Sequence, residues 1–129
     1  MNFTSQICTT KEQSERLLAL GLKKETADMC LHGTVDISFT QPFSRLAKIV
    51  SYPIIPAWSL HRLIEMMPKN IAIDGDTAYP LQIQKRSDGK WCVGYQGWYD
   101  CVGDLYDSVI WIYQLLISEG YLDEFCNKG

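Results

Sequence analysis

Histidine, the residue that most often moves protons in enzymes, is scarce in this chain. The 129 residues include two histidines, His32 and His61, and neither has a serine or cysteine beside it in a recognisable catalytic motif. The sequence strings that mark phosphate-binding loops, serine hydrolases and zinc proteases are also absent. The sequence therefore predicts a protein that is not an enzyme, with no catalytic residues and no cofactor. A small enzyme with an unrecognised site, in a pocket around His61 or His32, is the less favoured alternative.

No two cysteines stand in a CxxC motif, although the chain has five of them. Zinc sites need four ligands at recurring spacings, and Cys30 and His32 are the only close Cys/His pair, so we predict no metal site. Because no secretion signal is visible, the cysteines are expected to be free thiols. They are Cys8, Cys30, Cys92, Cys101 and Cys126.

Long apolar runs and an excess of basic charge are missing as well. No run approaches the roughly 20 residues that span a bilayer, and the first residues lack the basic and apolar regions of a signal peptide. We therefore expect a cytoplasmic protein that does not contact a membrane. The formal net charge is −3 and the Lys and Arg residues are scattered, which argues against a nucleic-acid partner.

The strongest helical signal lies between Gly103 and Gly120. Apolar residues recur there with the 3.6-residue period of a helix that is buried on most sides. Asp104 falls in its first turn, where a carboxylate faces the positive end of the helix dipole, and Gly120 suits the left-handed position after its last turn. A second helix is predicted over residues 57–67, with Pro56 opening its first turn.

The clearest strand signal is a hairpin that turns at residues 87–89. A two-residue loop would set polar side chains against apolar ones, whereas a three-residue loop with Gly89 in a left-handed conformation pairs Ile83 with Val93. We predict the three-residue loop, because it makes the two apolar faces coincide in the core. Residues 97–102 are then expected to form a loop that leads into the long helix. The two faces carry Leu81, Ile83 and Lys85 on one strand and Trp91, Val93 and Tyr95 on the other.

The N-terminal third carries weaker signals. Thr9 and Glu12 fit a capping box for a helix that Gly21 ends, and residues 23–29 are typical of a second helical turn that closes a small helical hairpin. Apolar and polar residues alternate over residues 34–40, which predicts a half-buried strand.

Together these elements predict one α+β domain over residues 1–129. Residues 1–51 hold the N-terminal helical hairpin and a strand, residues 52–122 form a core with the order α-β-β-β-α, and residues 123–129 are a tail. In this core a small antiparallel sheet with a central β-hairpin is covered by helices, giving a helix–sheet–helix sandwich.

Three stretches of the core carry a resemblance to a known family. They are Tyr52-Pro53-Ile54-Ile55-Pro56-Ala57-Trp58, Gly89-Lys90-Trp91-Cys92-Val93-Gly94-Tyr95 and Gly103-Asp104-Leu105. In these stretches the chain resembles the phage ABA-sandwich domain, which occurs in small uncharacterised proteins of phages and prophage-like mobile elements. The resemblance covers roughly residues 52–122 and implies a helix–sheet–helix sandwich and an origin of the phage or mobile-element type, but no reaction.

Three aromatic residues are the predicted binding residues. Trp98 and Tyr99 fall in the predicted loop before the long helix, where large rings have little reason to be. Trp111 falls on the polar side of that helix, so its indole is either covered by the N-terminal helical hairpin or presented to a partner.

The predicted function is therefore that of a non-enzymatic protein-binding module with an unknown protein partner. A homodimer through the helical layer is one arrangement that fits. A nucleic-acid-associated accessory protein is the alternative, which a basic stripe on one face of the sheet would support.

Overall fold

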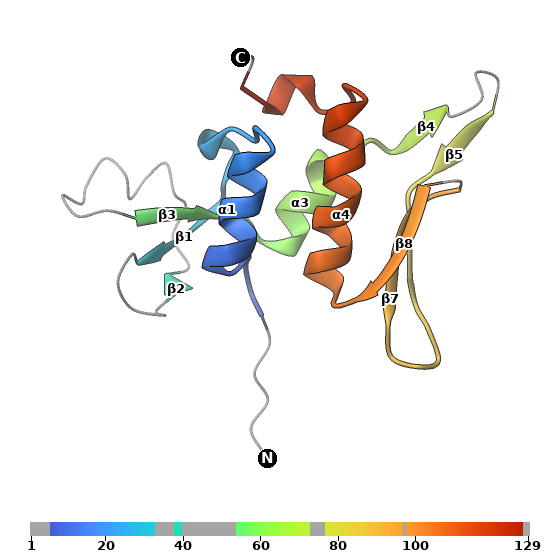
Figure 1. The fold of residues 1–129 in the computed structure, drawn as a ribbon, viewed down its shortest axis with the longest axis horizontal. Coiled ribbons are helices and arrows are strands. Elements are labelled where there is room, and N and C mark those ends of the chain that lie inside the picture. The colour runs from blue at the N-terminus through green and yellow to red at the C-terminus, as the bar shows by residue number, and fades with distance from the viewer. Residues whose placement is uncertain (1–5, 33–37, 40–53, 73–76, 97, 128–129) are drawn as a thin grey trace.

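Helices lie between two three-stranded antiparallel sheets in the computed structural model, which describes residues 6–32, 38–39, 54–72, 77–96 and 98–127 (Figure 1). This mixture of helices and antiparallel strands confirms the α+β class. The α-helices within the described residues are α1 (Lys11–Ala19), α3 (Leu60–Met66) and α4 (Leu105–Ser118).

The strands are short and every pairing is antiparallel. The first sheet has the order β2-β1-β3, the second the order β6-β7-β8, and β4 pairs with β5 in a separate ladder. The strands are β1 (Met29–His32), β2 (Ser38–Phe39), β3 (Ile54–Ala57), β4 (Asn70–Ala72), β5 (Ala78–Pro80), β6 (Gln82–Lys85), β7 (Trp91–Tyr95) and β8 (Trp98–Gly103). Two 3-10 turns complete the set, η1 (Lys24–Thr26) and η2 (Asp123–Phe125).

The long helix α4 lies at the centre of the core. Asp104 caps it, because its carboxylate accepts the N–H of Asp107, and Gly120 ends it with a φ of +82°, which confirms both predicted ends. The buried cluster joins α4 to α1, α3 and β7. Its completely buried side chains include Leu17, Leu63, Val93, Ile112, Tyr113 and Leu116.

The predicted capping box of α1 is wrong by one residue. Thr10 caps the helix and accepts the N–H of Gln13, whose side chain accepts the N–H of Thr10 in return. The Thr9 hydroxyl is used elsewhere: it bonds the Ser14 hydroxyl and accepts the N–H of Trp58. Thr9 therefore ties the start of α1 to the residue after β3.

The predicted helical hairpin is reduced to α1 and a single 3-10 turn. After η1 the chain enters β1 at Met29, so that residue belongs to a strand. Within the predicted strand over residues 34–40, Ser38 and Phe39 form β2, and the other residues lie outside the described part of the chain.

The second helix begins later than predicted. Pro56 lies in β3 opposite Cys30, and α3 starts after Ser59, whose hydroxyl accepts the N–H of Arg62. The residue between strand and cap, Trp58, is completely buried and donates its indole N–H to Thr26. The helix therefore does not start at Pro56, because this residue pairs with β1 in an extended conformation and the indole of Trp58 is buried.

The predicted register of the β6–β7 hairpin is confirmed. Ile83 lies opposite Val93, and Gly89 has a φ of +87° in the three-residue loop. The predicted burial of the β6 face is wrong: every residue of β6 is exposed, and Ile83 keeps 36% of its surface in contact with solvent. The helix α4 packs on β7 and β8 instead.

Residues 98–103 form a third strand of this sheet, so the prediction of a loop over residues 97–102 is wrong. Trp98 lies opposite Tyr95 and Tyr99 lies opposite Gly94. The backbone ladder between β7 and β8 therefore brings the chain back along the hairpin before α4 begins.

The residues predicted as a C-terminal tail are docked onto the end of α1. The N–H of Lys23 donates to the carbonyl of Phe125 at 2.8 Å, and the N–H of Asn127 donates to the carbonyl of Gly21 at 2.7 Å. Cys126 is buried between them. Hydrogen bonds to the N-terminal region, which the local sequence does not reveal, fix this segment up to residue 127.

Candidate interaction surface

Of the three predicted binding residues, Tyr99 and Trp111 lie on different elements, β8 and α4. Tyr99 lies on β8 with 37% of its surface exposed, and its hydroxyl donates to the side-chain carbonyl of Gln84 at 2.9 Å. Trp98 is the first residue of β8, and its side chain lies outside the described part of the structure.

Trp111 lies on α4 and packs, half-buried, against the core. It follows Asp107 by four residues and so shares the same side of the helix. The Asp107 carboxylate accepts a hydrogen bond from Gln13 at 2.8 Å and lies 3.5 Å from the Arg16 guanidinium. Because both partners belong to α1, Trp111 lies on the side of α4 that α1 approaches.

Tyr99 belongs to the opposite side of the β6-β7-β8 sheet. Side chains alternate between the faces of a strand, and Val93 and Tyr95 join the cluster around α4. Their neighbours on β7 therefore point away from α4, together with the residues paired with them. We call this side of the sheet the open face; its residues include Gln82, Gln84, Cys92, Gly94, Tyr99 and Cys101.

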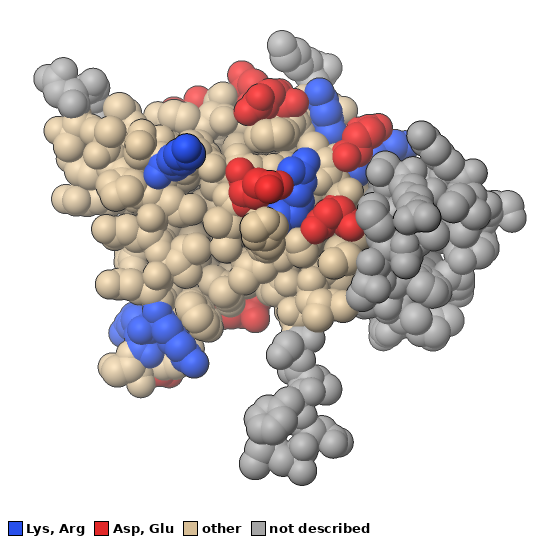
Figure 2. All heavy atoms as spheres, turned by 180° about the vertical axis from the view of Figure 1, so that it is seen from behind, with Lys and Arg blue, Asp and Glu red and all other residues tan. Residues whose placement is uncertain are grey.

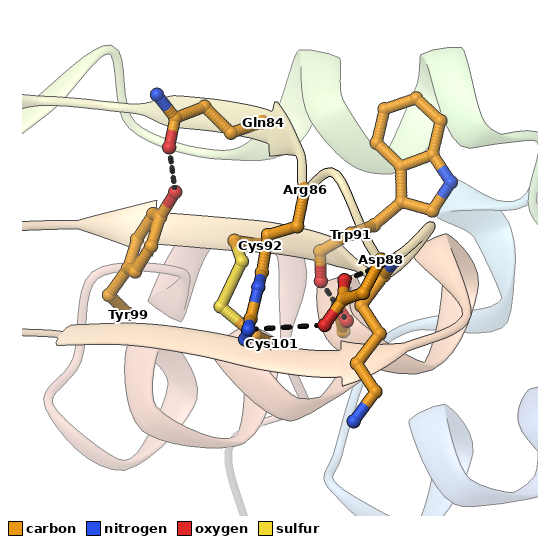
Figure 3. Close-up of a disulfide and its surroundings, with 9 residues drawn as sticks. Gln84, Arg86, Asp88, Trp91, Cys92, Tyr99 and Cys101 are labelled. Carbon is orange, nitrogen blue, oxygen red and sulfur yellow. Dashed lines mark hydrogen bonds and ion pairs between the residues drawn. A yellow bond between two sulfur atoms is a disulfide. The ribbon is translucent and has the colours of Figure 1, made fainter.

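A disulfide crosses the open face. Cys92 on β7 is bonded to Cys101 on β8, nine residues further along the chain, so the expectation of five free thiols is wrong. The bond lies beside the contact of Tyr99 with Gln84 (Figure 3). Two cross-links, one covalent and one hydrogen-bonded, therefore join the three strands on this face.

The end of the hairpin carries a cluster of cations. Lys85, Arg86 and Lys90, which we call the basic tip, share the end of the hairpin with one carboxylate, Asp88, and all four residues are exposed. Figure 2 shows this blue group at the projecting end of the molecule, at the lower left. Arg86 pairs with Asp88 at 3.1 Å, and the Lys85 ammonium lies 5.6 Å from the centre of the Trp91 ring.

Along part of β6, the backbone groups on one side form no hydrogen bond to any described residue. Arg86 donates its N–H to Lys90 across the hairpin. Because hydrogen-bonded pairs alternate along an antiparallel ladder, the backbone groups of Ile83 and Lys85 point away from β7. We call these outward groups the β6 edge.

The histidines and the Cys30 and Cys126 thiols lie outside the β6-β7-β8 sheet. His61 is 88% exposed at the side chain, and its Nε2 lies 3.8 Å from a carboxylate oxygen of Glu65, four residues further along α3. Burial raises the pKa of the Cys30 and Cys126 thiols, so both remain protonated and are weak nucleophiles at neutral pH. The side chain of His32 lies outside the described residues.

Neither a metal cluster nor a membrane-spanning helix is present in the described ranges. There, no three His, Cys, Asp or Glu side chains gather to hold an ion. None of the helices there is both long and apolar enough to cross a bilayer.

Known proteins offer no guide to the function of this surface. No family model, no curated protein and no solved structure matches this chain. The resemblance to the phage ABA-sandwich domain therefore stays a prediction.

Proposed function

We propose that this protein is a non-enzymatic protein-binding module that uses the open face and the adjoining hairpin. The exposed ring of Tyr99 carries the proposal. Tyrosine is enriched among the residues that dominate binding energy at interfaces, and this ring is fixed by its bond to Gln84 on a sheet that the disulfide cross-links. A side chain that is already ordered loses less entropy on binding.

Trp111 has a smaller part in this proposal than the sequence predicts. Its indole packs against the core of its own chain, which supports the intramolecular alternative. The homodimer through the helical layer, which relied on an exposed Trp111, is accordingly not part of the proposed function.

The second candidate function is that of a nucleic-acid-associated accessory protein. The basic tip favours it, because three exposed cations lie within one hairpin. Most of the open face argues against it, since its described side chains away from the hairpin end are Gln82, Gln84, Tyr99 and the disulfide, and phosphate binding draws on several cations.

The remaining predictions belong to the same proposal. They are the second helical layer of the sandwich over residues 52–122, the origin in a phage or mobile element, and the cytoplasmic location. The disulfide argues against the last of these, the cytoplasmic location, because the cytosol keeps most protein thiols reduced.

A capture experiment with matched tyrosine variants tests the proposal. The full-length tagged protein, Tyr99→Ala and Tyr121→Ala are incubated with lysate from cells that carry the gene, with and without nuclease, and retained proteins are quantified by mass spectrometry. Tyr121 is the control, because it is 37% exposed, as Tyr99 is, but follows the end of α4.

We expect a partner protein that stays bound to the tagged protein after nuclease treatment. Tyr121→Ala should retain the same amount of it, and Tyr99→Ala should retain several-fold less. Equal retention by both variants would contradict binding through the open face. Loss of all retained proteins after nuclease treatment would favour the nucleic-acid candidate.

A further inference from the structure

We infer that the β6 edge binds an extended acidic segment of the partner protein as an added β-strand. This inference rests on the proposed function and specifies the chemistry of the partner. Addition of a strand to a sheet edge is a general way for proteins to bind peptides, with backbone hydrogen bonds supplying the affinity.

The β6 edge continues a ladder that the chain itself begins. β4 pairs with β5, with Asn70 opposite Pro80, and the N–H of Leu81 donates to the carbonyl of Lys69 at 3.0 Å. A single residue separates β5 from β6, so the two strands follow one another closely. β4 therefore pairs with the side of this segment to which the backbone groups of Ile83 point. β4 begins after Lys69, so the position for a strand that would pair with Ile83 and Lys85 follows directly on this side.

The length of the edge suits a short strand. Gln82 to Lys85 are extended in β6, and Arg86 forms the last bonded pair before the turn. A strand of about five residues, a typical strand length in sheets, would cover this edge. Two outward residues, Ile83 and Lys85, each offer one N–H donor and one carbonyl acceptor. Within the described residues none of these groups has a partner.

Apolar surface lies beside the edge. Ile83 is exposed over 36% of its surface and shares its face with Leu81 and Trp91, which are half-buried. An added strand that places an apolar side chain on this face would cover Ile83. The same strand would place its alternate side chains on the open face, near Gln84 and Arg86.

Charge selects an acidic partner. Cations lie at both ends of the edge, Lys69 at one end and the basic tip at the other, and all are exposed. The single carboxylate of the hairpin, Asp88, is already paired with Arg86. The net charge of the chain is −3, but charges more distant than about 8 Å are screened at physiological salt, so the local cations determine the attraction.

A second copy of this chain fits the edge poorly. Antiparallel pairing of two β6 strands centred on Ile83 would bring Lys85 of one copy to the position of Lys69 of the other. Centring on Lys85 would set two lysines opposite each other, and centring on Gln84 would bring Arg86 beside Lys69. Like charges directly opposite destabilise a strand pair.

A peptide titration tests the inference with the full-length protein. The probe is a synthetic peptide in which glutamate and valine alternate, and a peptide of alternating lysine and valine is its charge control. Binding is followed by amide chemical shifts. The edge variant is Ile83→Pro, which removes an outward N–H and leaves the β6–β7 ladder bonds in place, because proline is tolerated on edge strands.

Charge is tested separately with Lys85→Glu, and Lys24→Glu is its control because Lys24 is exposed on η1, far from the hairpin in the sequence. We expect the glutamate peptide to bind the protein and Lys24→Glu alike, and to bind Ile83→Pro and Lys85→Glu about tenfold or more weakly. The amide spectra of the variants without peptide show whether each is folded.

Three results would overturn the inference: no binding of the glutamate peptide at about 1 mM, unchanged binding by Ile83→Pro, or a dimer of the free protein that Ile83→Pro dissociates. If the capture experiment still finds a partner lost with Tyr99→Ala, the proposed function stands and only the role of the β6 edge fails. If capture finds no such partner while the peptide binds as expected, the edge is established and the open face is not.

Discussion

At the scale of single residues, buried tyrosine hydroxyls connect elements that are distant in the sequence. Tyr113 on α4 donates to the carbonyl of Leu63 on α3, and Tyr95 on β7 donates to the carbonyl of Pro68. Burial raises the pKa of both phenols. The sequence places both rings in the core by periodicity, but it does not reveal these acceptors, which belong to other elements.

These phenols predict a loss of stability at high pH. The unfolded chain releases a tyrosine proton near the ordinary pKa of 10.0, whereas the folded chain keeps it, so the free energy of unfolding falls as pH rises above that value. Urea titrations from neutral pH to about pH 11 should show this fall, and a shallower one for Tyr113→Phe. At neutral pH Tyr113→Phe should lose about 1–3 kcal/mol, because the Leu63 carbonyl is left unsatisfied. An equal slope in the protein and the variant would contradict this origin; Tyr121→Phe is the exposed control.

At the scale of elements, local patterns predict what local interactions determine. The 3.6-residue period and the two caps predict α4, and the loop length predicts the register of the hairpin. β8 was missed because Trp98 to Gly103 shows no simple alternation and is extended only because it pairs with β7. The disulfide was missed for the same reason, since it depends on which residues of two strands lie side by side.

Tyr99 was predicted as a binding residue because a large ring in a predicted loop is unusual; the residue lies in strand β8 and is 37% exposed. The basic tip is visible in the sequence as three cations within six residues, 85–90, but the β6 edge is not. A strand edge is free only where no other strand pairs with it. Here the free part of β6 depends on the residue at which β4 starts, which the local sequence does not show.

The hairpin turn predicts a marked difference between two substitutions. Gly89→Val should lower the free energy of unfolding by about 1–2 kcal/mol, because a residue with a Cβ is strained in the left-handed conformation. Space is open around a Cβ at this position, so backbone strain alone is measured. Gly89→Asn should lose less, since asparagine visits this conformation. Equal denaturation midpoints for Val and Gly would show that the turn has another geometry.

The disulfide predicts a measurable cost of reduction. Cys101→Ser should destabilise the protein by about 2–3 kcal/mol, as expected for a bond that closes a loop of this size. A reducing agent should lower the denaturation midpoint of the wild-type protein by a similar amount and leave that of Cys101→Ser unchanged. A midpoint of the wild-type protein that does not respond to reduction would mean that this bond does not contribute to the stability of the fold.

At the scale of the whole molecule, one core joins α1 and the segment from Leu122 to Cys126 to α4. Gly21 and Lys23, just after α1, bond the segment that ends at Asn127, while the β6–β7 hairpin projects away from this core (Figure 1). Binding at the hairpin can therefore be altered by substitution without disturbing most of the core.

This arrangement predicts the effect of a charge at Trp111. Trp111→Glu should lower the free energy of unfolding, because it places a carboxylate against the core and beside Asp107, and it should leave the mass in solution equal to that of one chain. Light scattering together with urea denaturation measures both quantities. A wild-type dimer that Trp111→Glu converts into a stable monomer would instead favour the homodimer through the helical layer.

Amide hydrogen exchange along β6 tests the central claim most directly. In the free protein the amides of Gln84 and Arg86, which face β7, should exchange slowly, while those of Ile83 and Lys85 should exchange rapidly. The alternating glutamate–valine peptide should then slow Ile83 and Lys85 and leave the other two unchanged. Slow exchange of Ile83 and Lys85 in the free protein, or no change on adding the peptide, would contradict an open edge that accepts an acidic strand.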